Sequence, residues 1–532
     1  MTEKRTIILL SLAILLLFAG IFDHSLWTSD EPRVAEIARE MAVTGDYLIP
    51  KLSGKPFLEQ PPLYYTVAGA FWRIFGTGNE GFGRLSSVLF AAGTLFVVFF
   101  GTRALYGEHI AAFSALILAT TEQFFMISHK MVVDNALAFF ITGALFSFLL
   151  AYQQILKSGY VIFWICLAGA FLTKGIVGLA IPGVAVVLFA LWQRDFSVIR
   201  KAWVIPGILI VSAVILAWAW VLYFHGGKEF LYTFFLYNNL GRFLHVGIYE
   251  GGHVRPFYYY IPAVLLDGAP WSLLFIPALI ASLKIDERLR FFCSWFFGGL
   301  ILLTLASTKR GLYFLPMYPA MTVIVGQWMF RPDSEGSSQW ERGFLRSIFV
   351  LLTIIALLVP AGYVMIGGSI PLAIVGFLLS SSLLWLIYSM ITSSLPEWLP
   401  VAFAILILTW TPLLFPQIDT LKTYKPFFRE AGRIIGQDKV IGNNLTETVE
   451  AFSPFYGGFT VETVSDKKSF EQMILSRAAQ YAIILPGRSD ENLLKLLKSQ
   501  GEKVLEVGSR ERRYTQLWRL SKLTGGNAKE AK

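Results

Sequence analysis

Long apolar stretches recur along almost the whole chain. A helix needs about 20 predominantly apolar residues to cross the roughly 30 Å hydrocarbon core of a bilayer. Such stretches predict about thirteen membrane spans. They lie near residues 7–22, 82–101, 110–128, 133–153, 158–173, 175–193, 203–224, 258–282, 291–307, 311–330, 344–366, 369–391 and 399–416. Only 15% of the residues are charged, against about 25% in soluble proteins, so the chain is not a soluble globular protein.

Basic residues lie between the apolar stretches rather than in one patch. A net charge of +9 would also suit a nucleic-acid-binding protein, but dispersed cations are typical of the loops that orient membrane helices. We therefore expect membrane lipids, including anionic ones, as partners and no nucleic acid. The first stretch offers no clear small-residue cleavage site, so it is interpreted as a helix rather than a signal peptide.

The loop cations predict the topology of the chain. With the amino terminus inside, the more basic even-numbered loops face the cytoplasm. Three regions then lie outside, namely a first loop of about residues 23–81, a second loop of about 225–257, and everything after residue 416. Strand-like and helical patterns alternate in the tail, which predicts a small soluble α/β domain over 419–532 attached to a membrane domain over 1–418.

Two adjacent carboxylates, Asp30 and Glu31, follow the first span directly on the outer side. An acidic residue followed by Pro32 also begins many helices, so capping and catalysis both fit these residues. The length of the loop and its content of Pro, aromatic and ionisable residues favour function, because long structured loops usually carry it. We therefore take both carboxylates as catalytic candidates.

A second stretch of the same loop contains candidate substrate-binding residues. Glu59 and Gln60 precede two prolines, and Tyr64 follows in a segment of interfacial character. For Tyr64 an ordinary place in the aromatic belt of a membrane protein is the competing interpretation.

Several short outer loops break the charge rule with Lys130, Lys174, Lys309 and Arg310. Cations on one outer face can pair with the phosphate of a lipid head group, although snorkelling explains a single one equally well. Asp134 begins an apolar helix at the same face, and an ionisable group at membrane depth is a functional candidate.

Arg242, His245, His253 and Arg255 lie in the second outer loop. Two histidines with Glu59 supply at most three metal ligands, and Cys166 and Cys293 lie inside apolar stretches as buried small hydrophobes. A divalent metal is possible, but we expect no obligatory cofactor.

No nucleotide-binding or hydrolase motif is recognisable in the sequence. Ionisable residues gather at one face rather than at the bilayer middle, where a transporter usually places them. The residues alone therefore indicate a membrane enzyme that acts on a phosphate-bearing lipid at the outer surface.

The segments DEPRVAEIAREM and GDYLIPKLSGKPFLEQPP resemble the start of the bacterial aminoarabinose transferases and of the wider protein mannosyltransferase family, which are membrane glycosyltransferases of the GT-C fold. SHKMVVDN, FLTKGIVGLAIP, HVRPFYYYIP and STKRGLYFLPMYPA match in the same order. The resemblance implies inverting transfer of a sugar from a polyprenyl phosphate, usually undecaprenyl phosphate, at the periplasmic face of a bacterial inner membrane. The implied acceptor is lipid A or another envelope molecule.

The resemblance also implies roles for individual residues. Asp30 becomes the central acid, acting as general base toward a hydroxyl acceptor or as a positioning group toward a phosphate acceptor. Lys309, Arg310 and Tyr313 match the phosphate-side motif, with Arg33 or Arg242 assisting, and Lys174 and His253 fall in matching segments.

The chain departs from the aminoarabinose transferases at two places. Gln60 replaces a lysine, and Asn238 and Asn239 stand where Glu-His is expected, which weakens transfer of a metal site. The donor sugar and the acceptor stay open. The alternatives are a protein O-mannosyltransferase-like enzyme and a flippase or transporter of lipid-linked sugars.

Overall fold

Apolar helices dominate the first four fifths of the computed structural model, which describes residues 2–27, 30–241, 254–282, 287–330, 339–486, 491–508 and 514–520. A helix satisfies its own backbone hydrogen bonds, as the hydrocarbon of a membrane requires. Seven helical segments of the described residues are long and apolar enough to span a membrane, and each overlaps a predicted span. They are Glu80–Tyr106, Asp134–Tyr152, Ile176–Gln193, Val204–Gly241, Glu287–Leu305, Arg346–Met365 and Glu397–Lys422. Val204–Gly241 continues into the stretch that the sequence predicts as the second outer loop.

The other six predicted spans are shorter or bent within the described residues. Two are helix pairs, Glu108–Ala119 with Glu122–Ser128 and Phe257–Asp267 with Ser272–Ala281, which bend by 66° and 104°. If each pair is one span, the number rises to nine. Hydropathy summed over a window does not register such breaks. The remaining four predicted spans contain helices shorter than 18 residues in the described part of the chain. The protein is thus a mostly helical, multi-pass membrane protein.

The membrane part and the first loop contain these elements: α1 (Glu3–Phe18), α2 (Asp30–Thr44), β1 (Lys51–Leu52), β2 (Lys55–Pro56), α3 (Leu63–Phe75), α4 (Glu80–Tyr106), α5 (Glu108–Ala119), α6 (Glu122–Ser128), α7 (Asp134–Tyr152), α8 (Gly159–Lys174), α9 (Ile176–Gln193), α10 (Ser197–Lys201), α11 (Val204–Leu231), η1 (Tyr232–Gly241), η2 (Phe257–Tyr259), α13 (Tyr260–Asp267), α14 (Ser272–Ser282), α15 (Glu287–Leu305), η3 (Gly311–Met317), α16 (Tyr318–Met329), α17 (Gln339–Met365) and α18 (Ile370–Lys422).

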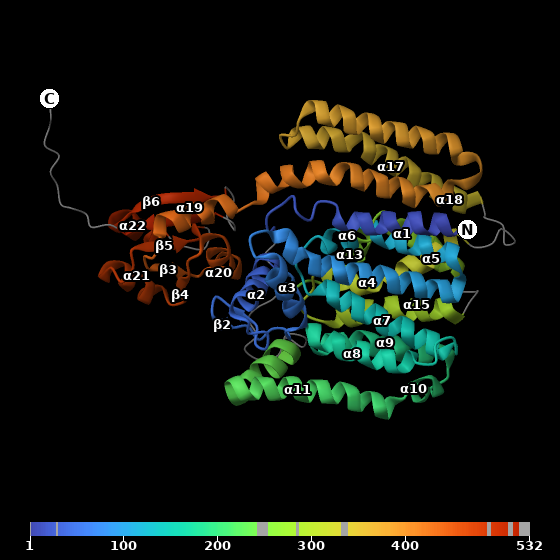
Figure 1. The fold of residues 1–532 in the computed structure, drawn as a ribbon, viewed down its shortest axis with the longest axis horizontal. Helices are drawn as coiled ribbons and strands as arrows, with labels where there is room; N and C mark the ends of the chain where they lie inside the picture. The colour runs from blue at the N-terminus through green and yellow to red at the C-terminus, as the bar shows by residue number, and fades with distance from the viewer. Residues whose placement is uncertain are drawn as a thin grey trace.

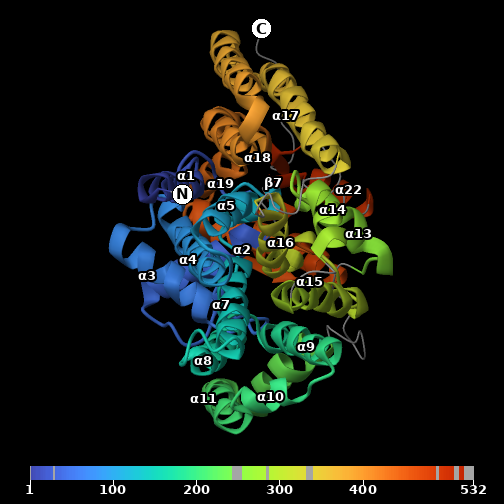
Figure 2. The ribbon, with the colours of Figure 1, turned by 90° about the vertical axis from the view of Figure 1, so that its right-hand side faces the viewer.

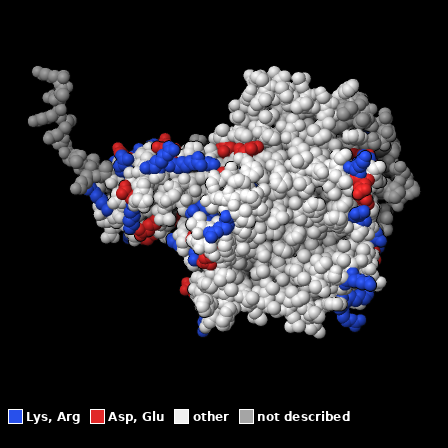
Figure 3. Space-filling model, in the orientation of Figure 1, with Lys and Arg blue, Asp and Glu red and all other residues white. Residues whose placement is uncertain are grey.

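The helices form an elongated body with the α/β domain at one end (Figure 1). Helices α17 and α18 form one edge of the body and α10 and α11 the opposite edge, with α4, α7 and α15 between them (Figure 2). Charged side chains gather toward both ends of the face in Figure 3, and a broad uncharged band separates them. Exposed apolar side chains such as Ile205 and Leu216 on α11 suit contact with lipid in this band.

A five-stranded sheet forms the centre of the carboxyl-terminal region. Its strands follow the order β4-β3-β5-β7-β6, in which β3 runs parallel to β4 and β5, whereas β7 runs antiparallel to β5 and β6. The elements are α19 (Lys425–Ile435), β3 (Val440–Asn443), α20 (Glu447–Phe452), η5 (Ser453–Gly457), β4 (Val461–Val464), α21 (Lys467–Ser476), β5 (Tyr481–Ile484), α22 (Glu491–Gln500), β6 (Glu502–Val507) and β7 (Thr515–Arg519).

The α/β region and the first outer loop share one hydrophobic core. Helices α2 and α3 contribute Ile37 and Trp72 to this core, while α19, α20 and β5 contribute Phe428, Phe452 and Ile483. The two regions are therefore packed against each other as a protein interior is packed.

Polar contacts reinforce that packing at the start of α4. Glu80 accepts hydrogen bonds from Lys425 at 2.6 Å and from the hydroxyl of Tyr456 at 2.9 Å. Beside them, the indole of Trp27 donates to Asp419, near the end of α18, at 2.7 Å. These hydrogen bonds hold the start of α4 and the residue Trp27, which precedes α2, against the end of α18 and the α/β region.

Candidate active site

Helix α2 begins at Asp30, as the Asp-Glu-Pro sequence predicts. This position turns the carboxylate of Asp30 toward the loop before η3, where Arg310 meets it with both guanidinium nitrogens. Nη1 donates to Oδ1 at 2.8 Å and Nη2 donates to Oδ2. Such a two-pronged pair is the strong geometry for an arginine and a carboxylate.

The charges around Asp30 keep it ionised. Burial acts to raise its pKa, but the hydrogen bonds and charge of Arg310, together with Arg33 and Lys174, outweigh burial. The pKa of this carboxyl therefore lies below its ordinary value of 3.8. Conversely, hydrogen bonding and the charge of Asp30 outweigh burial at Arg310 and raise the pKa of its guanidinium.

A second ion pair joins α7 and α8. Lys174, the last residue of α8, lies with Nζ 2.5 Å from Oδ1 of Asp134, the first residue of α7. The same ammonium lies 4.2 Å from the ring centre of Tyr313. Lys174 thus connects the helix start predicted at Asp134 with the aromatic residue of η3.

Arg33 gathers three carboxylates from three parts of the chain. Its guanidinium lies 3.2 Å from Asp30 on its own helix and 3.7 Å from Glu59 in the first loop, and it also pairs with Glu447 of α20. The α/β region therefore reaches the candidate site through Glu447.

Three cavities meet around these groups. A small polar cavity is lined by Asp30, Arg33, Val34, Glu59, Gln60, Val132, Val133, Asp134, Lys174, Arg310, Leu312 and Tyr313. On one side it shares Glu59, Gln60, Lys174 and Tyr313 with a mainly apolar cavity of about 380 Å³. On the other side it shares Asp30, Val132, Arg310 and Leu312 with a polar cavity of about 430 Å³.

The two larger cavities differ in chemistry. The apolar one lies among α9, α15 and η1, and its walls include Val177, Leu240 and Leu303. The polar one has cationic and acidic walls, made by Lys130, Arg255, Lys309, Arg310, Asp30, Glu122 and Asp267. Lys309 is itself anchored, since its ammonium donates to the carbonyls of Ala306 at 2.5 Å and Arg255 at 3.3 Å.

Two residues proposed from the sequence lie outside the walls of these cavities. Glu31 is completely buried and pairs with Arg84 at 2.9 Å, so its role in the fold is to hold the start of α2. Tyr64 is also buried, and its hydroxyl lies 2.6 Å from that of Ser87 and accepts from Ser86 at 3.1 Å. Their residue types and positions in the sequence make Glu31 a catalytic candidate and Tyr64 a substrate-binding candidate. Helix packing turns both side chains toward the interior of the protein.

Arg242, His245 and His253 lie outside the described residues, so the structure does not place them. Among the residues that it does describe, no group of three or more His, Cys, Asp or Glu side chains is arranged to hold a metal ion. Independence from an obligatory metal stays a prediction.

Sequence reasoning missed the contributions of Glu447, Glu122 and Asp267. Glu447 belongs to a tail without recognisable motifs, and only the fold brings it to Arg33. Glu122 follows the bend between α5 and α6, and Asp267 ends α13 before the next bend. Both therefore lie at breaks inside stretches that the sequence predicts as continuous spans.

Comparison with known proteins shows which families the chain resembles in sequence and in fold. The family model described as dolichyl-phosphate-mannose-protein mannosyltransferase matches residues 59–220. The chain is 32% identical over 328 residues to an uncharacterized protein of Aquifex aeolicus, covering 61% of this chain and 74% of that protein. It is 27% identical over 346 residues to the undecaprenyl phosphate-alpha-4-amino-4-deoxy-L-arabinose arabinosyl transferase of Aeromonas salmonicida, covering 63% and 62%.

The match to curated aminoarabinose transferases spans about three fifths of their length. The fold match is more extensive. The crystal structure of ArnT from Cupriavidus metallidurans bound to undecaprenyl phosphate superimposes with a TM-score of 0.80 at 18% identity, covering 99% of this chain and 100% of that one. The chain therefore belongs to the GT-C membrane glycosyltransferases and resembles the bacterial aminoarabinose transferases.

Proposed function

We propose that the protein is an inverting glycosyltransferase that moves a sugar from a polyprenyl phosphate, undecaprenyl phosphate in bacteria, to lipid A or another cell-envelope acceptor. The observation that carries this proposal is the position of Asp30 and Arg310 at the junction between an apolar and a polar cavity. A lipid-linked donor and a polar acceptor need such a pair of chambers.

The apolar cavity suits the isoprenoid part of the donor. Its aliphatic walls bury apolar surface, while Lys174 and Tyr313 stand at its polar end. An ammonium and a phenol hydroxyl can hold a phosphate there. Lys174 thereby supplies a cation at the junction where Gln60 replaces the lysine of the aminoarabinose transferases.

Transfer at this junction breaks the bond between the anomeric carbon and the phosphate oxygen, and the polyprenyl phosphate leaves with the electron pair. The acceptor oxygen forms the new bond from the opposite face, which inverts the anomeric carbon. Arg310 and Lys174 stabilise the charge that develops on the leaving phosphate. A hydroxyl acceptor passes its proton to Asp30, whereas an acceptor phosphate is already ionised and needs Asp30 only for positioning.

The polar cavity suits an acceptor that carries both negative charge and hydroxyl groups. Lys130, Arg255 and Lys309 supply cations on its wall, and Glu122 and Asp267 supply hydrogen-bond acceptors. A phosphorylated glycolipid such as lipid A has both kinds of group. Its phosphates would meet the cations, and its sugar hydroxyls would meet the carboxylates.

The proposed topology follows from the sequence. Thirteen spans with the amino terminus in the cytoplasm put the three cavities and the domain over 419–532 on the periplasmic side of a bacterial inner membrane. The concentration of ionisable site residues at the end nearest the α/β domain supports this orientation.

The test is turnover of polyprenyl-phosphate sugars by the purified protein in detergent, with lipid A and peptide offered separately. Asp30→Asn keeps shape but removes charge and basicity, so turnover should fall by about 10²–10⁴-fold. Asp46→Asn is the matched control, because Asp46 lies in the same loop and pairs with Lys51 at 2.8 Å away from the cavities. Full activity of Asp30→Asn would contradict the proposed role of Asp30 in sugar transfer.

Protein O-mannosyl transfer is the second candidate, supported by the family description that matches residues 59–220. A mass increase on peptide and none on lipid A would select it. Absence of any new glycosidic bond in detergent, where there are no two compartments, would favour a flippase or transporter instead.

A further inference from the structure

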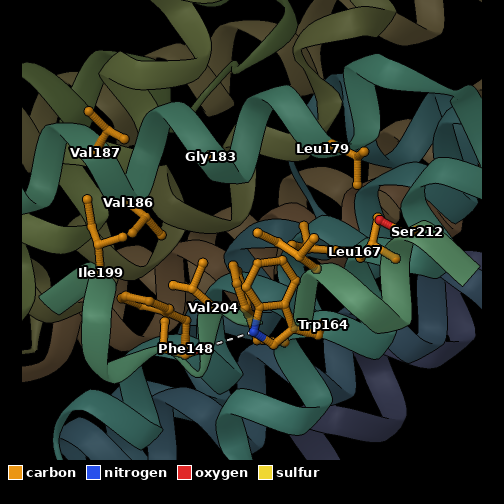
Figure 4. Close-up of a pocket in the computed structure, with 14 residues that line it drawn as sticks. Phe148, Trp164, Leu167, Leu179, Gly183, Val186, Val187, Ile199, Val204 and Ser212 are labelled. Atoms are coloured by element: carbon orange, nitrogen blue, oxygen red, sulfur yellow. Dashed lines mark hydrogen bonds between the residues drawn. The ribbon is translucent and has the colours of Figure 1, made fainter. Parts of the chain in front are cut away.

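A separate apolar cavity lies between α8, α9, α10 and α11. It measures about 350 Å³, which falls in the range of about 300–1,000 Å³ that small-molecule pockets occupy. Phe148, Leu167, Val186 and Ile199 contribute to its wall (Figure 4). The indole N–H of Trp164 is satisfied within the wall, since it donates to the carbonyl of Ala202 at 2.7 Å.

The lining selects an apolar occupant. Ser212 is the one hydroxyl-bearing residue among the 14 described residues that line the cavity. A buried water molecule needs about two to four polar partners, and the described lining of this cavity supplies too few of them to hold water. A flexible hydrocarbon chain suits it, because the chain can follow an irregular apolar wall.

Cations lie next to residues that line the cavity. Ile199 and Ala202 line the cavity, and the two residues between them, Arg200 and Lys201, are exposed. Arg194 is exposed just before the short helix α10. The neighbouring Asp195 is directed to the backbone and hydroxyl of Ser197, from which its oxygens accept at 2.8 Å. Blue side chains accordingly cluster over α10, at the end away from the α/β domain (Figure 3).

Aromatic residues mark the same level. Trp192, Phe196 and Trp203 are 41%, 59% and 56% exposed, which is typical of side chains at the boundary between hydrocarbon and head groups. Helix α10 therefore contributes an apolar side chain to the cavity wall and exposed cations at the level of the head-group phosphates.

We propose that this cavity holds an acyl chain of an anionic phospholipid whose head group is bound by Arg200 and Lys201. The site is distinct from the apolar cavity of the candidate active site. Helix α9 separates the two, since Val186 and Val187 line this one and Val177 and Ala180 line the other. The bound lipid fills a void between helices and stabilises the α8 to α11 edge of the body.

The test is native mass spectrometry of the full-length protein with phosphatidylglycerol and, separately, zwitterionic phosphatidylethanolamine of the same acyl composition. Phosphatidylglycerol should bind more tightly. Each interfacial cation contributes about fivefold to the affinity for anionic lipid, so Arg200→Ala with Lys201→Ala should weaken binding about 30-fold. Arg103→Ala is the matched control, because Arg103 is an exposed cation near the far end of α4 and pairs with Glu108 at 3.5 Å.

A second variant tests the cavity itself. A Cβ added at Gly183 meets no atom within 4 Å, so Gly183→Leu can grow into the void without a clash at its first carbon. This variant should lose phosphatidylglycerol binding yet keep its thermal stability in lipid-free detergent. Unchanged binding by both variants, or equal binding of the two lipids by the native protein, would overturn the proposal. Displacement by polyprenyl phosphate at equimolar concentration would likewise overturn it, by assigning the cavity to the donor tail.

Discussion

Arg84 and Glu31 form a completely buried ion pair under the start of α2, and its removal is a sharp test of the structure. Arg84 donates to Oε1 of Glu31 at 2.9 Å and to the carbonyls of Ile21, His24 and Ser25 at 2.9, 2.8 and 2.8 Å. Arg84→Met keeps the length of the side chain but removes the cation that pairs with the buried Glu31 carboxylate and the donor to three carbonyl oxygens. Breaking a buried pair from one side costs about 3–5 kcal/mol.

We expect the stability of Arg84→Met to fall by that amount, and Glu31→Gln to lose a similar amount because Arg84 is then the unpaired charge. The double variant should lose clearly less than the sum of the two, since neither charge is left alone. Denaturant unfolding in mixed micelles, followed by tryptophan fluorescence, measures these differences. Lys51→Met serves as the control, because its pair with Asp46 is exposed and contributes about 0–1 kcal/mol.

Two outcomes would refute this reasoning. A loss below about 1 kcal/mol for Arg84→Met would mean that water or relaxation satisfies the groups that Arg84 contacts. Full stability of Glu31→Gln together with loss of sugar transfer would make Glu31 a catalytic group, as its type and position in the sequence suggest. The structure leads us to expect the opposite result. Asp30→Asn should be inactive but lose less stability than Glu31→Gln, because the pair of Asp30 with Arg310 borders the cavities, whereas the pair of Glu31 with Arg84 is completely buried.

Three further predictions concern the charges around Asp30. Burial raises the pKa of Asp30, and Arg310 is the main influence that lowers it. Arg310→Gln should therefore raise this pKa and move the acid limb of the pH profile of turnover to higher pH. An acid limb that does not move would mean that Asp30 is not the group whose titration limits turnover. In the native protein the same lowered pKa means that the stability from this pair is present above pH 3.8 and is lost as pH falls through the folded-state pKa. Glu447→Gln should change the KM for donor, because Glu447 pairs with Arg33, and should affect the free energy of unfolding little, because its side chain is half exposed. Glu462→Gln is the control. It breaks an exposed pair with Lys439 at 2.7 Å and should leave the KM unchanged.

The sequence predicts much of the site because membrane topology sorts charges by face. Asp30 and Arg310 are 280 positions apart, yet both follow apolar stretches that end on the predicted outer side. Hydropathy and the charge rule are therefore enough to place Asp30, Asp134, Lys174 and Arg310 on one face. They are not enough to pair them, because pairing depends on how neighbouring helices rotate and bend.

Adjacent residues show the limit most clearly. Asp30 and Glu31 have the same chemistry and neighbouring positions, but successive residues of a helix point about 100° apart. One carboxylate therefore faces Arg310 and the cavities, and the other faces Arg84 and the interior. The packing of α2 against α4 decides between these outcomes, and a single sequence carries no direct sign of it.

The shared core bears on how the α/β region contributes to function. A domain joined to the membrane part only by a linker could change position without disturbing the site. Here Phe428 and Phe452 pack in the same core as Ile37 of α2, and Glu447 pairs with Arg33 one turn after Asp30. Movement of the α/β region would therefore move the helix that carries Asp30, because close-packed interiors transmit displacement rather than absorb it. The α/β region and the helix that carries Asp30 are therefore parts of one packed unit.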